Sequence, residues 1–213
     1  MGINLSKSQP GEGINLTKNQ VINLKKPTPE SAMFDLSKIT LGMGWDITGG
    51  RKFDLDASCM LLNKDGKLAD SKDVVAYFDK RHHSGKVWST GDNTTGEGEG
   101  DDEQIIAELE SLDAKYDKLV FFVNIYEGKS RKQRFSDIAN AYCRAMDANG
   151  KEIFRFVISN NPDLNNKYSF IFAEVYRGSN GWELKALGEA HETDAISGIT
   201  EKYKAKTGLF SKF

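Results

Sequence analysis

The segment at residues 91–103 is the part of this sequence best suited to chemistry. It reads Gly-Asp-Asn-Thr-Thr-Gly-Glu-Gly-Glu-Gly-Asp-Asp-Glu, and its six carboxylates, one amide and two hydroxyls are accompanied by no Lys or Arg. Four glycines allow tight turns, so carboxylates and backbone carbonyls can face one centre. Calcium takes about six to eight such oxygen ligands in flexible geometry, whereas zinc prefers His and Cys. The segment therefore predicts a calcium-binding loop, with a solvated acidic loop as the alternative.

This acidic loop, residues 91–103, does not follow the EF-hand pattern. If Asp92 takes the first position, Glu103 takes the twelfth as the motif requires, but Glu97 takes the sixth. The sixth position of an EF-hand is a glycine that makes a sharp turn. We therefore reject an EF-hand and expect a different loop geometry.

A second pair of acids lies in the segment 53–62, which alternates apolar and polar residues at its start. The apolar residues fall on one face of a predicted strand, and Asp54, Asp56 and Ser58 fall on the other. Residues two apart on a strand face the same side, about 6.5–7 Å from each other. Two carboxylates at that spacing repel each other unless water or a cation screens them. The pair is therefore either a second source of calcium ligands or a pair that faces water.

Both acidic segments, with a glycine-rich stretch before them, resemble the signature of the TerD family of tellurium-resistance and stress-response proteins. In chain order, the resemblance rests on residues 42–46 (Gly-Met-Gly-Trp-Asp), 53–58 (Phe-Asp-Leu-Asp-Ala-Ser) and 91–103, extended by 122–127 and 140–144. It covers roughly residues 31 to 210. The resemblance implies a β-sandwich domain that binds calcium through the acidic segments, in a bacterial protein linked to tellurite resistance. It implies no reaction.

Together, the acidic segments supply the expected ligands for one or two Ca²⁺ ions. The expected ligands are Asp54, Asp56, Asp92, Asn93, Glu97, Gly98, Asp101, Asp102 and Glu103, with Gly98 contributing its backbone carbonyl. Asp46, at the end of an expected strand, is either a further ligand or a turn residue.

The function that we expect is a non-enzymatic, calcium-binding stress-response protein associated with tellurite resistance. One alternative is a calcium-dependent adaptor that docks on a phospholipid surface or on another stress-response or membrane-associated protein. A calcium-dependent hydrolase is a weaker alternative, because carboxylate pairs can act as acid and base. The sequence contains no nucleophile elbow, no phosphate-binding Gly-Lys loop and no His-Glu-x-x-His motif.

The elements expected to hold these segments are short strands separated by Gly and Asn turns. Alternating apolar residues predict strands near residues 39–45, 53–62, 118–126, 141–145, 152–159, 168–177 and 182–187. Residues 74–78 and 103–112 each fit either a strand or a helix, and the family resemblance favours a strand at 103–112. Residues 193–207 predict a helix capped by Thr193 or Asp194 and ended by Gly208. The expected fold is mainly β, a two-sheet β-sandwich with a short C-terminal helix.

Two parts of the chain are expected. Residues 2–9 nearly repeat as residues 13–20, so residues 1–30 predict a duplicated strand or hairpin segment packed on the main domain. Residues 31–213 are then the TerD-like sandwich.

Composition excludes several classes of protein. Lys and Arg total 29 against 31 Asp and Glu, which argues against a general nucleic-acid binder. No segment approaches the ~20 apolar residues of a membrane span, and no apolar signal-peptide run begins the chain, so we expect a cytoplasmic protein without a transmembrane segment.

Three smaller features have structural interpretations. Cys59 and Cys143 are expected to be buried free thiols. The adjacent His82 and His83 are expected in an exposed loop, because neighbouring residues do not easily ligate one ion. The basic run at residues 129–134 is expected to be a solvated loop that faces the acidic cluster.

Overall fold

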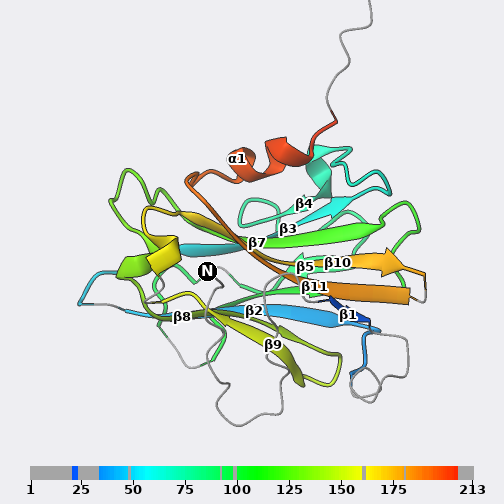
Figure 1. The fold of residues 1–213 in the computed structure, drawn as a ribbon, viewed down its shortest axis with the longest axis horizontal. Helices are drawn as coiled ribbons and strands as arrows, with labels where there is room; N and C mark the ends of the chain where they lie inside the picture. The colour runs from blue at the N-terminus through cyan, green and yellow to red at the C-terminus, as the bar shows by residue number, and fades with distance from the viewer. Residues whose placement is uncertain are drawn as a thin grey trace, which may run out of the picture.

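Two antiparallel sheets packed face to face make up the structure (Figure 1). The computed structural model describes residues 21–23, 34–47, 49–91, 93–97, 100–159, 162–179 and 181–205. The two sheets confirm the expected β-sandwich. Within the described ranges, no helix has the length and apolar character needed to cross a bilayer.

The larger sheet has six strands. Their order is β1 (Val21–Asn23), β11 (Gly181–His191), β10 (Ser169–Gly178), β7 (Lys118–Ile125), β3 (Leu55–Leu62) and β4 (Val74–Val75). The predicted strand near residues 118–126 is β7, which lies between β10 and β3 and is buried on both faces. Residues 74–78, which fitted either a strand or a helix, contain the two-residue strand β4.

The smaller sheet has five strands. Their order is β5 (Val87–Ser89), β6 (Glu103–Ala107), β2 (Ile39–Asp46), β8 (Ala139–Met146) and β9 (Glu152–Val157). Strand β6 shows that the start of the ambiguous segment 103–112 is a strand. Because β6 begins at Glu103, the acidic loop runs directly into the sheet.

The main core fills the space between the sheets. Apolar residues of β3 point into it, as the alternation predicted, and Phe121, Phe154 and Phe156 are buried there. Cys59 and Cys143 are both buried and free, which confirms the expectation for the two thiols. Burial raises the pKa of each thiol well above its usual value.

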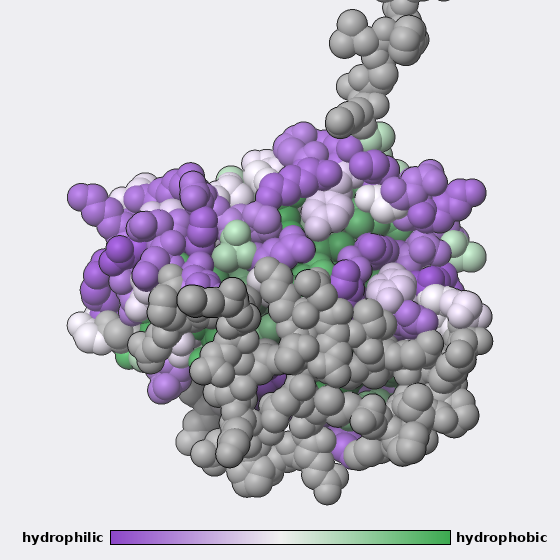
Figure 2. All heavy atoms as spheres, viewed as in Figure 1, coloured by the Kyte–Doolittle hydropathy of each residue, from purple (hydrophilic) through white to green (hydrophobic). Residues whose placement is uncertain are grey.

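A second, smaller core covers the outer face of the larger sheet. Met60, Val120 and Phe122 pack there beneath α1 (Ile196–Thr200), which lies on the side away from the smaller sheet (Figure 1). Hydrophilic residues cover most of the described surface around α1, and hydrophobic surface is visible just below it (Figure 2). Asp56, on the same face of β3 as Met60, is only 3% exposed, so the alternative in which it faces water is wrong.

The C-terminal helix is shorter than predicted. Helix α1 is followed by a 3-10 turn at Glu201–Tyr203, and the predicted end at Gly208 lies outside the described residues. Neither expected residue caps it: the Thr193 hydroxyl accepts the amide of Ala195, and Asp194 accepts the amide of Lys129. These side chains are therefore used to connect α1 to the preceding strand and to a neighbouring loop.

The expected N-terminal segment is described only in part. Strand β1 pairs with β11, so residues 21–23 belong to the larger sheet. The repeated residues 2–9 and 13–20 lie outside the described ranges, and the division of the chain at residue 30 stays a prediction.

The structure corrects the expectation of an exposed loop for His82. An isolated bridge between Arg81 and Trp88, with a hydrogen bond from the His82 amide to Val87, folds this turn back onto the molecule. As a result the His82 side chain is 1% exposed, whereas His83 is exposed as expected.

Candidate metal centre at the acidic loop

Asn93 closes the acidic loop by hydrogen bonds. Its Oδ1 accepts the amides of Thr95 and Gly96, both at 3.0 Å. Its Nδ2 donates to the carbonyl of Glu97 at 3.2 Å and to Asp102 Oδ1 at 2.7 Å. Because the side-chain carbonyl of Asn93 is used inside the loop, this residue shapes the loop more directly than it offers a ligand.

The loop packs on Trp45, which connects it to the acidic strand. Gly96 has φ +72° and lies so close to the Trp45 indole that an added Cβ would clash with the ring. The indole Nε1 in turn donates to the carbonyl of Phe53 at 2.9 Å. Lys52 Nζ lies 3.3 Å from Glu97 Oε1, an exposed pair that adds little stability. The loop therefore lies beside residues 52–53, just before β3.

Asp101 faces the outer side of the smaller sheet. Its carboxylate accepts from Arg144 Nε at 2.8 Å, from Gln104 Nε2 at 2.9 Å and from the Tyr142 hydroxyl at 3.0 Å. The side chain is 1% exposed and lies over Gly42, where a Cβ would collide with it. Burial, with the charge of Asp101, raises the pKa of Tyr142 to about 12. Arg144 thus balances the charge of this carboxylate.

Asp102 lies where the loop meets the end of β2. Its Oδ2 accepts the Trp45 amide at 2.9 Å, and its Oδ1 accepts from Asn93. Burial raises the pKa of the Asp102 carboxyl, and the charges of Asp46 and Asp101 raise it further. Asp46 itself, exposed at the end of β2, accepts from Asn140 Nδ2 at 2.6 Å.

Glu103 points between the two sheets. It is 3% exposed, and its Oε2 accepts the amide of Ala57 in β3 at 2.7 Å. Consecutive acids 101, 102 and 103 therefore face three different surroundings. Of the three, Glu103 is the one that ties the acidic loop to the acidic strand.

Asp54 and Asp56 lie on the outer side of the larger sheet. Asp56 is opposite Asn124 of β7, whose Nδ2 lies 3.3 Å from Asp56 Oδ2. Arg131 of the basic run lies 3.7 Å from Asp54 Oδ2, so part of that run does face the acidic strand.

Two neutral oxygens beside Asp56 are buried without a hydrogen bond. Ser58 Oγ and Asn124 Oδ1 have no hydrogen-bond partner within the described part of the chain. Such groups are uncommon in folded proteins because each costs free energy. The sequence singled out neither residue as a ligand, although an Asn in the otherwise apolar run 119–125 was a visible signal.

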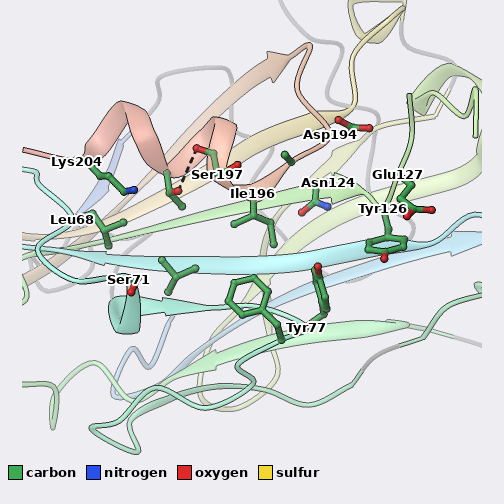
Figure 3. A pocket seen from close by; sticks show the side chains of 14 residues that line it. Leu68, Ser71, Tyr77, Asn124, Tyr126, Glu127, Asp194, Ile196, Ser197 and Lys204 are labelled. Carbon is green, nitrogen blue, oxygen red and sulfur yellow. Dashed lines mark hydrogen bonds between the residues drawn. The ribbon is translucent and has the colours of Figure 1, made fainter. Parts of the chain in front are cut away.

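A pocket of about 590 Å³, partly lined by Asn124, opens between α1 and the segment around Tyr77. Asn124 and Tyr126 lie at one end with Glu127 and Asp194, and Lys204 lies at the other end (Figure 3). The pocket therefore gives the Asp56 side of the sheet an acidic opening. Of the other expected ligands, Asp92 and Gly98 lie outside the described residues.

Comparison with known proteins identifies the family to which the chain belongs. The TerD domain family matches residues 13–203. The tellurium resistance protein TerX of Serratia marcescens is 38% identical over 228 residues, covering 95% of this chain and 100% of that protein. The stress response protein SCP2 of Bacillus subtilis is 36% identical over 204 residues, covering 89% of this chain and 98% of that protein.

A solved structure shares the fold. It is described as a homologue of telluride resistance protein from Streptomyces coelicolor, and it superposes with a TM-score of 0.66 at 20% identity. The match covers 80% of this chain and 99% of that one. At this level of identity the likeness supports the sandwich fold alone.

Proposed function

Because the chain belongs to the TerD domain family, we propose that it serves in tellurite resistance and stress response by binding calcium. The names of the relatives from Serratia marcescens and Bacillus subtilis support the resistance and stress role. The oxygen-rich surroundings of the acidic loop support the calcium role. We propose a non-catalytic function, because those relatives are named for resistance or stress and not for a reaction.

The proposed ion site lies where the acidic loop meets the start of β3. Its carboxylate donors form two groups, one for each of two ions: Asp102 and Glu103 on the acidic-loop side of β3, and Asp54 and Asp56 on the outer side of the larger sheet. Asp92 and the carbonyl of Gly98 are expected donors outside the described residues. Asn93 and Glu97 shape the loop. Asp101 is left out of the proposed ligand set, since Arg144 already balances its charge.

One observation carries the proposal: the 2.7 Å hydrogen bond from the Ala57 amide to Glu103 holds the acidic loop against the acidic strand. Carboxylates from residues far apart in the sequence are thereby brought to one region. Like charges held together at low exposure repel unless a cation offsets them.

The donor chemistry fits calcium. Ser58 Oγ and Asn124 Oδ1 are buried neutral oxygens without a hydrogen bond, on the same side of the sheet as Asp56. Neutral and charged oxygens together are the ligands that Ca²⁺ prefers. When bound, the ion would neutralise the carboxylates and fix the loop on β3.

Two buried free thiols also support a reducing, cytoplasmic location, which we include in the proposal.

Titration calorimetry with CaCl₂ tests the proposal. We expect saturable binding of one or two ions to the unmodified protein and to Asp65→Asn, a control at an exposed turn residue. Asp56→Asn keeps the side-chain shape but removes a charge, so it should lose the heat of the ion on the outer side of the larger sheet while remaining folded by circular dichroism. No heat from the unmodified protein at millimolar calcium, together with an unchanged melting temperature, would show that the proposal is wrong.

A further inference from the structure

Four side chains away from the acidic loop form a compact polar cluster. Asp73 ends a 3-10 turn at Ser71–Asp73, His82 and His83 lie in the turn before β5, and Tyr116 lies just before β7. The candidate ligand atoms of Asp73, His82 and His83 all lie within 4.8 Å of one another. Three separate stretches of the chain therefore bring two imidazoles, a carboxylate and a phenol together.

The contacts of the cluster run through the Asp73 carboxylate and the Tyr116 hydroxyl. Asp73 Oδ1 lies 3.2 Å from His82 Nε2 and accepts the Tyr116 hydroxyl at 2.6 Å. The same hydroxyl lies 3.2 Å from His83 Nε2. Both imidazole Nε2 atoms are thus directed at the group formed by the carboxylate and the phenol.

The turn explains how adjacent histidines reach one place. On a strand, neighbouring side chains point to opposite faces. Here the chain turns at residues 83–84, and the rings of His82 and His83 lie 4.0 Å apart between centroids at an interplanar angle of 40°. Neighbouring residues do not easily ligate one ion in an extended chain, but this turn brings the two rings to the same place.

We propose that Asp73, His82 and His83 bind a divalent transition metal, Zn²⁺ in the first place. Two imidazole nitrogens and one carboxylate oxygen are a donor set typical of zinc, with a fourth position for Tyr116 or water. Calcium, which takes oxygen ligands, is disfavoured by two imidazoles. The exposed side chain of His83 provides the route by which the ion enters.

The surroundings of His82 fit a ligand that must be neutral. Burial lowers the pKa of His82 below its usual value, so the ring is uncharged near neutral pH. The Ser84 hydroxyl lies 2.7 Å from His82 Nδ1. With a metal at Nε2 the ring proton sits on Nδ1, which donates a hydrogen bond to that hydroxyl and no longer accepts the Ser84 amide at 3.2 Å. Such an outer partner orients a metal-binding imidazole.

The test uses tag-free protein freed of metals by a chelator. Zn²⁺ is titrated by calorimetry, and Co²⁺ by visible absorption, in which low-coordinate cobalt gives strong bands. We expect one equivalent of either metal, binding that excess Ca²⁺ does not displace. His83→Ala removes an exposed ligand and should weaken Zn²⁺ binding at least about tenfold, because even outer-shell changes cost about 10–100-fold.

His191→Ala is the matched control, because it removes the third histidine of the chain, which lies in β11 and contacts Lys202. It should bind Zn²⁺ like the unmodified protein. Asp73→Asn gives a second, nearly isosteric loss of a ligand, and should abolish the cobalt bands. The proposal is overturned if the unmodified protein binds no Zn²⁺, or if His83→Ala and His191→Ala bind it equally well.

Discussion

Replacing Glu103 separates its role in folding from its role in binding calcium. The Glu103 carboxylate is buried and accepts the Ala57 amide at 2.7 Å. Strand β4 pairs with β3 at Cys59 and Met60, so the Ala57 amide lies on a part of the β3 edge that β4 does not cover. Glu103→Ala leaves the amide without its acceptor, whereas Glu103→Gln keeps an acceptor oxygen and removes the charge.

The two substitutions should differ in the calcium-free protein. A hydrogen bond to a charged group contributes about 1.5–3 kcal/mol to the free energy of unfolding. In a domain of about 200 residues, 1 kcal/mol shifts the melting temperature by about 2–4 °C. We therefore expect Glu103→Ala to lower the melting temperature by about 3–12 °C in chelator, and Glu103→Gln to lower it by less than about 4 °C.

With calcium, both variants should lose the benefit of the ion. At a free concentration of about 100 times Kd, a ligand that binds only the folded state adds about 2.7 kcal/mol, or about 5–11 °C here. Differential scanning calorimetry with chelator and with calcium measures both effects. An unchanged melting temperature for Glu103→Ala in chelator would refute the folding argument. A full calcium-induced rise in Glu103→Gln would remove Glu103 from the ligand set.

Two further predictions concern the groups that hold the loop. Gly96→Ala should lower the free energy of unfolding more than Gly66→Ala does. Both glycines have a positive φ, which costs a residue with a Cβ about 1–2 kcal/mol. At Gly96 the added Cβ would also collide with the Trp45 indole, whereas at Gly66 it meets no atom within 4 Å. Urea unfolding compares them, and equal losses would contradict the packing of Gly96 on Trp45. Arg144→Met should cost about 3 kcal/mol by leaving Asp101 buried without its cation. Adding Asp101→Asn should recover at least about 1 kcal/mol, and strict additivity would show that the pair is not coupled.

Much of the fold could be predicted because the alternation of apolar and polar residues along a strand indicates which of its faces is buried. The apolar residues of β3 and β7 alternate or cover both faces, and each segment forms the expected strand. The short helix α1 was harder, since the predicted caps Thr193 and Asp194 make hydrogen bonds with residues that only the fold brings near.

The surroundings of the candidate site depended on long-range packing. Asp56 has the spacing of a water-facing residue but is 3% exposed, and the Asn124 side chain that contacts it lies 68 residues away in the sequence. Asp101, Asp102 and Glu103 form one acidic run in the sequence, but consecutive residues entering a strand change direction, which sends each to different partners. The partner Arg144 lies 43 residues from Asp101, beyond any local pattern.

The short helix α1 and the acidic strand are connected through one pocket. Ile196 of α1 and Asn124 of β7 line the same pocket, so the helix and the polar residues beside Asp56 share one wall. Asn124 also lies 3.3 Å from Asp56, so one side chain joins the acidic strand to the pocket that α1 lines. The surroundings of Asp56 therefore reach the surface beside α1 through a side chain of the central strand β7.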